Sequence, residues 1–280
     1  MRKTVVCVLT GAALAVSMIG STACFAEEQK TFTVGFDAEY PPYGYMDESG
    51  EYLELAQAVC DLEGWELVKT PIDWDSKDME LNSGSIDCIW NGFTMNGREE
   101  DYTWSKPYVD NSQVIVVPES SDVTDLSGLA GKIVGVQAAS AALELLSEGG
   151  DQADLAATFG SLQQFPDYNN AFVELQAGSI DAVAMDIGVA QYQLKQKEGY
   201  KILDEKLNSE KYAIGFKLGN EELRDTVDDA MDQLVADGTF AKLAEKYELT
   251  DMVCLGTDEG ETETETEGVQ TEAATEAVTE

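Results

Sequence analysis

The stretch NGFTMNGR, residues 91–98, decides the fold assignment of this chain. It follows directly on an apolar run, residues 86–90, which predicts a short buried strand. A strand that ends in a Gly- and Asn-rich turn presents side chains at the carboxyl edge of a sheet, where ligands bind in open α/β proteins. Thr94 brings a hydroxyl group to this edge, and Arg98 brings a planar guanidinium suited to a carboxylate. Taken alone, these residues fit an ordinary strand–turn–helix junction with a surface arginine better than a binding site, and the rest of the chain reverses that balance.

Outward from this stretch, β-prone apolar runs alternate with amphipathic helical patterns, which predicts an α/β fold. The predicted strands are 31–36, 65–72, 86–90, 113–118, 132–137, 161–165, 180–185 and 212–216. Helices are predicted at 53–62, from 74 onward, after 138, at 171–177 and 187–196, and on the apolar stripes 223–234 and 240–247.

Composition excludes several classes of function. The chain has 280 residues and a net charge of -37, from 54 acidic and 17 basic residues. Nucleic-acid binding is excluded because phosphate contacts need patches of Lys and Arg. The chain contains no histidine, which removes Ser-His-Asp triads, Cys-His pairs and His-ligated metal sites.

The amino end predicts an export signal over residues 1–26: Arg2 and Lys3 precede an apolar run, 5–19, and small residues follow. Residues 22–24, Thr-Ala-Cys, resemble the end of a bacterial lipobox, although Ser21 stands where Leu is usual. Cys24 would then carry a lipid, and cleavage after Ala26 is the alternative. We therefore expect an extracytoplasmic protein, either a cell-surface lipoprotein or a periplasmic or secreted one.

Two further features concern the mature chain. Cys60 and Cys88 could pair in an oxidising compartment, or each could be a separately buried thiol. Residues 255–280 are rich in Thr, Glu and Gly and offer little apolar surface to bury, so we expect a disordered acidic tail.

Three more segments carry candidate binding groups. The loop 37–45 places Asp37 and Tyr40 beside a Pro-Pro pair that keeps it extended. The helix expected after residue 138 starts with unpaired backbone N–H groups, which suit an anion. Asp186 ends the predicted strand 180–185, where its carboxylate could accept an ammonium group or cap the next helix.

Together these motifs resemble the extracellular solute-binding proteins of family 3, the polar amino-acid receptors of bacterial ABC importers. The resemblance covers residues 31 to 250. The motifs that carry it are Asp-x-x-Tyr-Pro-Pro at 37–42, Gly-Phe-Thr with Arg98, Trp-Ser-Lys-Pro-Tyr at 104–108, Gly-Val-Gln-Ala at 135–138, Ile-Asp-Ala at 180–182 leading to Asp186, and Gly-Thr-Phe at 238–240.

The resemblance implies a two-lobed, periplasmic-binding-protein-like (type II) α/β fold, with two hinge strands and a ligand cleft between the lobes. Lobe 1 would comprise residues 30–116 and 209–254, and lobe 2 residues 117–208. The hinges would lie near 116–119 and 208–212.

The resemblance also implies roles for residues of the cleft. Arg98 would hold the α-carboxylate of an amino acid bidentately, and Thr94 would bond to the same head group. The Gly92 carbonyl and the Asp186 carboxylate would accept from the ammonium group. The remaining expected contacts are backbone N–H groups of Ser140 and Ala141 for the carboxylate, and Asp37, Tyr40 and Trp74 around the ligand side chain, with Trp90 either in the cleft or in the core.

The sequence departs from the family pattern in two places. Tyr52 runs directly into the helix that begins near Leu53, as if about four residues were missing, which puts the geometry around Asp37 and Tyr40 in question. Ala139-Ser140-Ala141 replaces the usual Gly-Ser-Ser/Thr, so one hydroxyl contact is lost.

The function implied is that of the substrate-binding component of an ABC amino-acid importer. It would act as a monomer, without cofactor, metal or catalysis, and deliver its ligand to a membrane permease. An enzyme similar to cyclohexadienyl dehydratase and a sensor module acting in trans are the alternatives. The absence of histidine and the intact amino-acid clamp argue against the enzyme.

Overall fold

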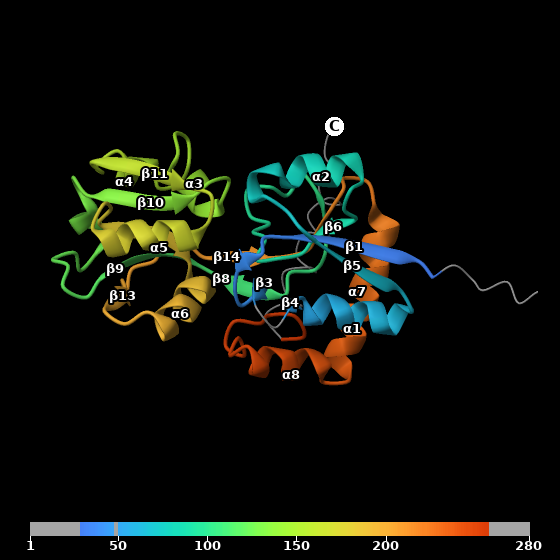
Figure 1. The fold of residues 1–280 in the computed structure, drawn as a ribbon. Helices are drawn as coiled ribbons and strands as arrows, with labels where there is room; N and C mark the ends of the chain where they lie inside the picture. Colours follow the sequence, from blue (N-terminus) through green and yellow to red (C-terminus); the bar gives the residue numbers. More distant parts are fainter. Residues whose placement is uncertain (1–28, 48–49, 258–280) are drawn as a thin grey trace, which may run out of the picture.

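A computed structural model describes residues 29–47 and 50–257. The expected export signal, Cys24 and nearly all of the expected tail lie outside the described residues. Figure 1 shows two α/β lobes side by side, joined in the middle by short strands.

Lobe 1 is built on a five-stranded sheet of order β5-β1-β6-β15-β7. β1 runs parallel to both β5 and β6, whereas β15 is antiparallel to β6 and β7. The strands are β1 (Thr31–Phe36), β5 (Glu66–Pro71), β6 (Cys88–Ile89), β7 (Thr103–Trp104) and β15 (Gly215–Phe216).

Helices cover both faces of this sheet (Figure 1). α1 (Glu54–Glu63), α7 (Glu221–Ala236) and α8 (Thr239–Lys246) pack on one face, in the core cluster that contains Phe32, Val34 and Trp90. α2 (Lys77–Ser83), preceded by the 3₁₀ turn Trp74–Ser76, covers the other face. Trp90 therefore belongs to the core.

Lobe 2 has a sheet of order β11-β10-β12-β9-β13. β10 is parallel to β11 and β12, and β9 is antiparallel to β12 and β13. The strands are β9 (Gln113–Pro118), β10 (Ile133–Gln137), β11 (Ser161–Phe165), β12 (Ala182–Asp186) and β13 (Tyr200–Ile202).

The central strand β12 is buried on both faces because its side chains alternate between two clusters. Val183 and Met185 pack with α5 (Tyr168–Ala177) and α6 (Ile187–Gln196), and Ala182 and Ala184 pack on the side of α3. The shorter helices of this lobe are α3 (Ala141–Leu146) and α4 (Ala153–Ala156), and a 3₁₀ turn spans Leu126–Leu129.

The lobes are joined by β8 (Val109–Asn111) and β14 (Glu210–Tyr212), which pair antiparallel with Asn111 opposite Glu210. The sequence-based boundary at residue 116 falls inside β9, which lies wholly in the sheet of lobe 2. The chain therefore enters lobe 2 about residue 112, a few residues earlier than the sequence suggested. The second expected hinge, 208–212, contains β14.

A small three-stranded sheet connects β1 to α1. It comprises β2 (Glu39–Tyr40), β3 (Gly44–Asp47) and β4 (Gly50–Tyr52). Leu53 is the residue at the amino end of α1, so the helix follows β4 without a connecting loop. The short connection noted in the sequence is therefore accommodated where the hairpin meets the helix.

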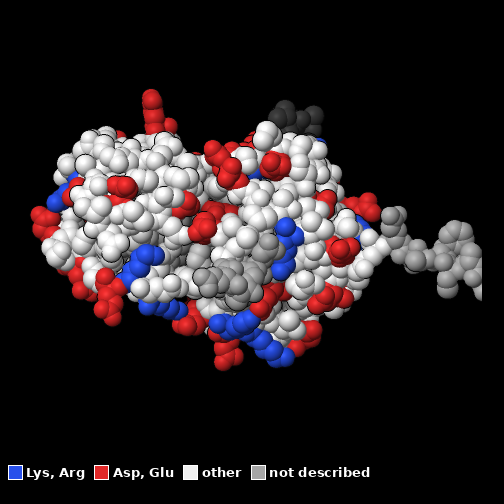
Figure 2. All heavy atoms as spheres, in the orientation of Figure 1, with Lys and Arg blue, Asp and Glu red and all other residues white. Residues whose placement is uncertain are grey.

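Cys60 and Cys88 are free, buried thiols in the core of lobe 1, so of the two alternatives the structure contains the unpaired one. On the face shown in Figure 2, acidic side chains are spread over both lobes. A distributed negative charge of this kind favours solubility and repels acidic surfaces.

Candidate functional site

The predicted site residues follow the carboxyl ends of parallel strands in both sheets, the edge where ligands bind in open α/β proteins. Asp37 follows β1, the stretch 91–98 follows β6, Ser140 follows β10, and Asp186 is the last residue of β12. The two edges face each other across the junction of the lobes (Figure 1).

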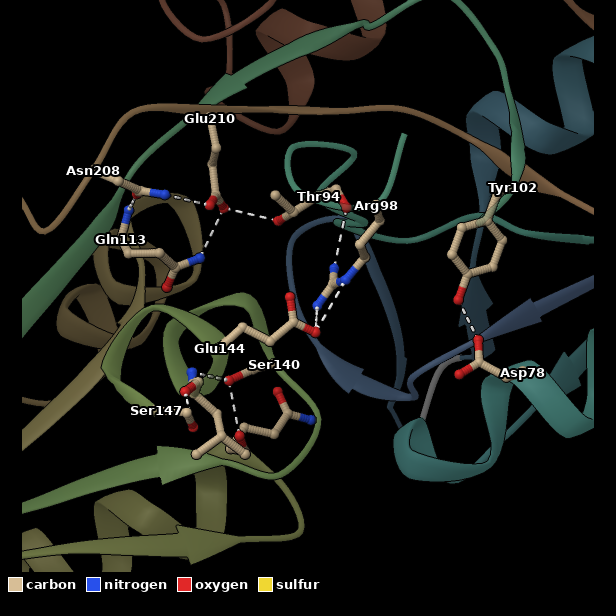
Figure 3. Close-up of polar contacts among 12 residues, drawn as sticks. Asp78, Thr94, Arg98, Tyr102, Gln113, Ser140, Glu144, Ser147, Asn208 and Glu210 are labelled. Atoms are coloured by element: carbon tan, nitrogen blue, oxygen red, sulfur yellow. Dashed lines mark hydrogen bonds and ion pairs between the residues drawn. The ribbon is translucent and has the colours of Figure 1, made fainter. Parts of the chain in front are cut away.

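Arg98 reaches from lobe 1 to lobe 2. Its guanidinium donates to one carboxylate oxygen of Glu144 on α3, from Nη2 at 2.6 Å and from Nε at 3.2 Å (Figure 3). Nη1 donates to the Thr94 carbonyl at 3.1 Å, and the Trp104 indole N–H donates to the backbone carbonyl of Arg98 at 2.9 Å. The side chain is only 8% exposed, so the guanidinium is fixed in position and faces the other lobe.

Thr94 is aligned beside the returning hinge strand. The Met95 N–H donates to the Lys211 carbonyl, and the Ala213 N–H donates to the Phe93 carbonyl. This pairing places the Thr94 hydroxyl 2.8 Å from Glu210 Oε1, to which it donates (Figure 3). The hydroxyl predicted to bind an amino-acid head group is thus engaged with a carboxylate that the sequence reasoning had not considered.

Asp186 is buried, with 3% of its surface exposed. Its Oδ1 accepts from the Asn111 amide at 2.7 Å, the Gln113 amide at 2.6 Å and the Tyr212 hydroxyl at 2.5 Å. Its Oδ2 accepts from the Tyr168 hydroxyl at 2.9 Å. The carboxylate makes no capping bond to α6, so the alternative role predicted for it, as a helix cap, is wrong.

Asn111 and Gln113 connect Asp186 to Glu210. The same Asn111 nitrogen donates to Glu210 Oε1 at 2.7 Å, and the Gln113 nitrogen donates to it at 2.8 Å. Arg98, Thr94, Glu210 and Asp186 therefore belong to one continuous buried network. Burial, followed by the nearby Asp186 charge, raises the pKa of Glu210.

Gly92 and Tyr40 lie against the hinge. A Cβ atom on Gly92 would come within 2.5 Å of the Tyr40 ring and 2.7 Å of the Tyr212 ring, so only glycine fits there. The Tyr40 and Tyr212 hydroxyls are 3.1 Å apart, and the Tyr40 and Tyr168 ring centroids are 5.9 Å apart. Tyr40 thus joins the aromatic groups around Asp186.

Asp37 and Trp74 line a cavity of about 660 Å³ that both lobes border. Asp37 accepts from the Glu39 N–H at 2.8 Å and from the Gln137 amide of lobe 2 at 2.7 Å. Burial raises the pKa of Asp37 to about 6, against the opposing effect of these two hydrogen bonds. Trp74 packs edge-to-face on Phe93, with ring centroids 5.4 Å apart.

The Ser140 side chain caps the start of α3. The Ser140 hydroxyl accepts from the Leu143 N–H at 3.1 Å and donates to the Gln137 carbonyl at 2.8 Å. Ala139, where the family usually has glycine, has a φ of 54°, a left-handed conformation that suits glycine better. The N–H groups of Ser140 and Ala141 lie at this helix start.

Sequence reasoning missed Glu210, Asn111, Gln113 and Glu144. Asn111 and Gln113 are two apart, so they project to the same side of an extended chain, and this spacing was the available signal. Lys77 was also missed: it is 5% exposed, with its ammonium 5.3 Å from the Trp74 ring centroid. Burial lowers the pKa of Lys77, and nearby Asp78 opposes this effect.

Within residues 29–47 and 50–257, no group of three or more His, Cys, Asp and Glu side chains is arranged to hold a metal ion. In that same part of the chain, no helix has the length and apolar character needed to cross a membrane.

The fold and the charged groups between the lobes define a two-lobed binding protein. The profile of the family "Bacterial extracellular solute-binding proteins, family 3" matches residues 32–250, and the chain belongs to this family.

Relatives within the family bind amino acids. The chain is 26% identical over 229 residues to the L-cystine-binding protein TcyJ of Escherichia coli K12, covering 79% of this chain and 84% of that protein. It is 26% identical over 257 residues to the histidine-binding periplasmic protein of the same organism, covering 84% and 94%.

Solved structures agree with this assignment. An ABC uptake transporter substrate-binding protein from Streptococcus pneumoniae with bound histidine superposes with a TM-score of 0.74, at 30% identity, over 78% of this chain and 92% of that one. An ancestral arginine-binding protein bound to arginine superposes with a TM-score of 0.72, at 33% identity, over 78% and 98%.

Proposed function

We propose that this protein is the extracytoplasmic substrate-binding component of an ABC importer and that it binds a free amino acid between its lobes. Relatives that bind cystine, histidine and arginine support this assignment. The observation that carries it is the position of two opposite charges. Arg98 of lobe 1 and Asp186 of lobe 2 belong to one buried network at the junction of the lobes.

Arg98 is the group for the α-carboxylate. Its planar guanidinium can donate two parallel hydrogen bonds to a carboxylate. In the structure it already binds the carboxylate of Glu144. In the liganded protein, the α-carboxylate would replace Glu144 at the guanidinium. The Thr94 hydroxyl, the Gly92 carbonyl and the N–H groups of Ser140 and Ala141 would complete the head-group contacts.

Asp186 is the group for the α-ammonium. Because Arg98 and Asp186 belong to different lobes, a zwitterion that contacts both charges has its full affinity only when the lobes are closed. Differential affinity of this kind shifts the equilibrium toward the closed state. Asp37, Tyr40 and Trp74 would then surround the ligand side chain, next to the cavity that Asp37 and Trp74 line.

The proposed cellular setting follows from the same role. The protein would function outside the cytoplasm, either released after cleavage near Ala26 or anchored by a lipid on Cys24. It would act as a monomer and hand its ligand to an ABC permease in the membrane. Metabolic labelling with a fatty acid, compared between wild type and Cys24→Ala, tests the anchor.

We also propose that the protein has no catalytic activity. Its charged groups between the lobes are paired with neutral donors or with each other, as suits reversible binding of a zwitterion. Incubation of the purified protein with prephenate and with arogenate should give no product. Turnover of either compound would overturn this part of the proposal.

A thermal-shift screen against the common amino acids and L-cystine tests the assignment, because a ligand that binds the folded state raises the melting temperature by mass action. We expect at least one amino acid to raise it in a concentration-dependent way. If none does, the protein is not an amino-acid receptor.

Two variants test the roles of the charges. Arg98→Ala should abolish binding in calorimetry, and Asp186→Asn should weaken it by about 2–5 kcal/mol, as when a buried charge loses its partner. Lys132→Ala is the control, since Lys132 pairs with Asp122 on the surface of lobe 2. Circular dichroism checks that each variant is folded. Undiminished affinity in Arg98→Ala would refute its role.

A further inference from the structure

Two carboxylates that come from different parts of the chain meet at the hinge. Asp186 ends β12 of lobe 2, and Glu210 begins the crossing strand β14. Both are buried, at 3% and 4% exposure. They share the same two amide nitrogens: Asn111 Nδ2 and Gln113 Nε2 each lie 2.6–2.8 Å from both carboxylates. The two acids are therefore direct neighbours.

Only neutral groups donate to this pair within the described part of the chain. Asp186 accepts from two amides and from the hydroxyls of Tyr168 and Tyr212. Glu210 accepts from the same amides, the Thr94 hydroxyl and the Asn208 amide. Burial raises the pKa of both tyrosines well above 10, so their hydroxyls remain protonated. No positive charge offsets the two carboxylates through these contacts.

The amides that bridge the pair also leave acceptors unused. Asn111 Oδ1 and Gln113 Oε1 have no hydrogen-bond partner among the described residues. Both residues are buried, at 2% and 0% exposure, so bulk water does not reach these oxygens. Their nitrogens must face the carboxylates, so reversing either amide would place an oxygen against an oxygen. A buried acceptor without a partner costs about 1–3 kcal/mol. Such groups are retained where something else satisfies them.

Carboxylates and orphaned carbonyl oxygens together have the chemistry of a cation site. A primary ammonium group has three N–H donors and one positive charge. It would supply what this cluster lacks, namely hydrogen bonds to the free oxygens and a charge between the acids. Without a cation, burial and the neighbouring Asp186 charge raise the pKa of Glu210, which favours its protonated form.

We propose that Glu210, with Asp186 and the side-chain oxygens of Asn111 and Gln113, forms a cation subsite at the hinge that receives the ligand's ammonium group, and that a proton held by Glu210 leaves to the buffer as the ammonium binds. This rests on the proposed function and adds three residues to it. Asn111 and Glu210 are directly paired across the crossing strands β8 and β14, so the ammonium is bound where the hinge bends.

The other titratable groups around Glu210 do not replace the ligand's charge. Tyr40 lies beyond Tyr212, and its pKa is also raised by burial. Lys206 and Lys211 border a surface groove that Glu210 also lines, and the Lys211 ammonium pairs with Asp110 at 3.2 Å. Arg98, the nearest cation along the network, is paired with Glu144.

Calorimetry in two buffers of different ionisation enthalpy measures the proton released on binding. L-arginine and L-cystine are the probes, at pH 5 and pH 8. Wild type should release more protons at pH 5 than at pH 8, because the raised pKa leaves Glu210 more protonated at the lower pH. Glu210→Gln should bind about tenfold more weakly and release none. Glu210→Asp keeps the second carboxylate and should restore part of the release.

The outcomes separate this inference from the proposed function. If neither probe nor any other amino acid binds wild type, the proposed function fails. If a probe binds wild type but without proton release, and Glu210→Gln binds equally well, only the cation subsite fails. If CaCl₂ or KCl alone raises the melting temperature of wild type but not of Glu210→Gln, the subsite holds an inorganic cation and the ammonium assignment is overturned.

Discussion

At the scale of single residues, the contact between Arg98 and Glu144 bears on the carboxylate-binding role that we propose for Arg98. Glu144 offers the guanidinium a carboxylate of the kind a ligand would bring. Since the Glu144 side chain is 54% exposed, the pair contributes about 0.2–1 kcal/mol. In the proposed binding mode, Glu144 would therefore compete with the ligand without excluding it.

Removing this competing charge should strengthen binding. We expect Glu144→Gln to bind the amino acid identified in the screen up to about fivefold more tightly, because Arg98 is no longer neutralised. Calorimetry at low ionic strength measures the change. Glu148→Gln is the control, since Glu148 is an exposed acid just beyond α3. Weaker binding by Glu144→Gln would mean that Glu144 assists the ligand.

The sequence was informative about residues at strand ends and silent about their partners. Arg98, Thr94 and Asp186 could be singled out because each follows a buried apolar run. Glu210 could not, because its contact with Thr94 joins residues 116 positions apart. Polar residues on a short hinge strand also have the pattern of an exposed loop. Their burial arises only when two lobes and two crossing strands meet.

At the scale of elements, α5 positions one of the groups around Asp186. At the start of this helix, the Asp167 carboxylate accepts a hydrogen bond from the Asn170 N–H at 2.8 Å. The first residue of the helix, Tyr168, donates to Asp186. The cap therefore fixes the end of the helix from which this hydroxyl projects.

Loss of the cap should loosen this helix start. Asp167→Ala should lower the free energy of unfolding by about 1 kcal/mol, because a backbone N–H at the helix start loses its acceptor. Urea unfolding followed by circular dichroism measures the loss. Asp167→Asn retains a capping oxygen and should lose much less. Equal losses in the two variants would show that the charge of Asp167 matters, rather than the cap.

Element types followed from periodicity more reliably than boundaries. The strand predicted at 31–36 coincides with β1. The run 212–216 is instead divided between β14 and β15, because the chain leaves the hinge at Tyr212 before it enters the sheet of lobe 1. Strand 86–90 narrows to Cys88–Ile89, because only these two residues pair with β1 and β15. Apolar character alone does not reveal which sheet a strand joins.

At the scale of the whole molecule, side chains of the two lobes contact one another across their junction. Arg98 contacts Glu144, Asp37 contacts Gln137, and Lys195 on α6 pairs with Glu248 beyond α8 at 2.6 Å. Asp37 is the one of these groups whose pKa rises to about 6 on burial. Stability and pH are therefore linked through this carboxyl.

The sign of that link can be tested. Because folding raises the pKa of Asp37 from 3.8 to about 6, the folded chain holds more protons in that interval, and stability falls as pH rises through it. The full effect is on the order of 2–3 kcal/mol. Asp37→Asn should lose correspondingly less stability between pH 4 and pH 7 in urea unfolding.

Two comparisons make this test specific. Asp228, whose pKa burial also raises to about 6, is present in both proteins, so its contribution cancels in the difference. Asp154→Asn makes the same change of charge on α4, a short helix without buried residues. This variant should keep the wild-type dependence of stability on pH. An Asp37→Asn slope identical to that of wild type would show that Asp37 is not the titrating group.

The sheet order of lobe 1 has a consequence for how the polypeptide is made. β15 lies between β6 and β7, yet it follows them by more than a hundred positions and comes after all of lobe 2. The strands of the lobe 2 sheet are contiguous in sequence, so a nascent chain can complete that sheet before β15 is synthesised. Until β15 is made, the strand that lies between β6 and β7 is missing. Until then both have open edges, which are potential sites of aggregation. A segment synthesised after all of lobe 2 thus completes the sheet of the lobe that was begun first.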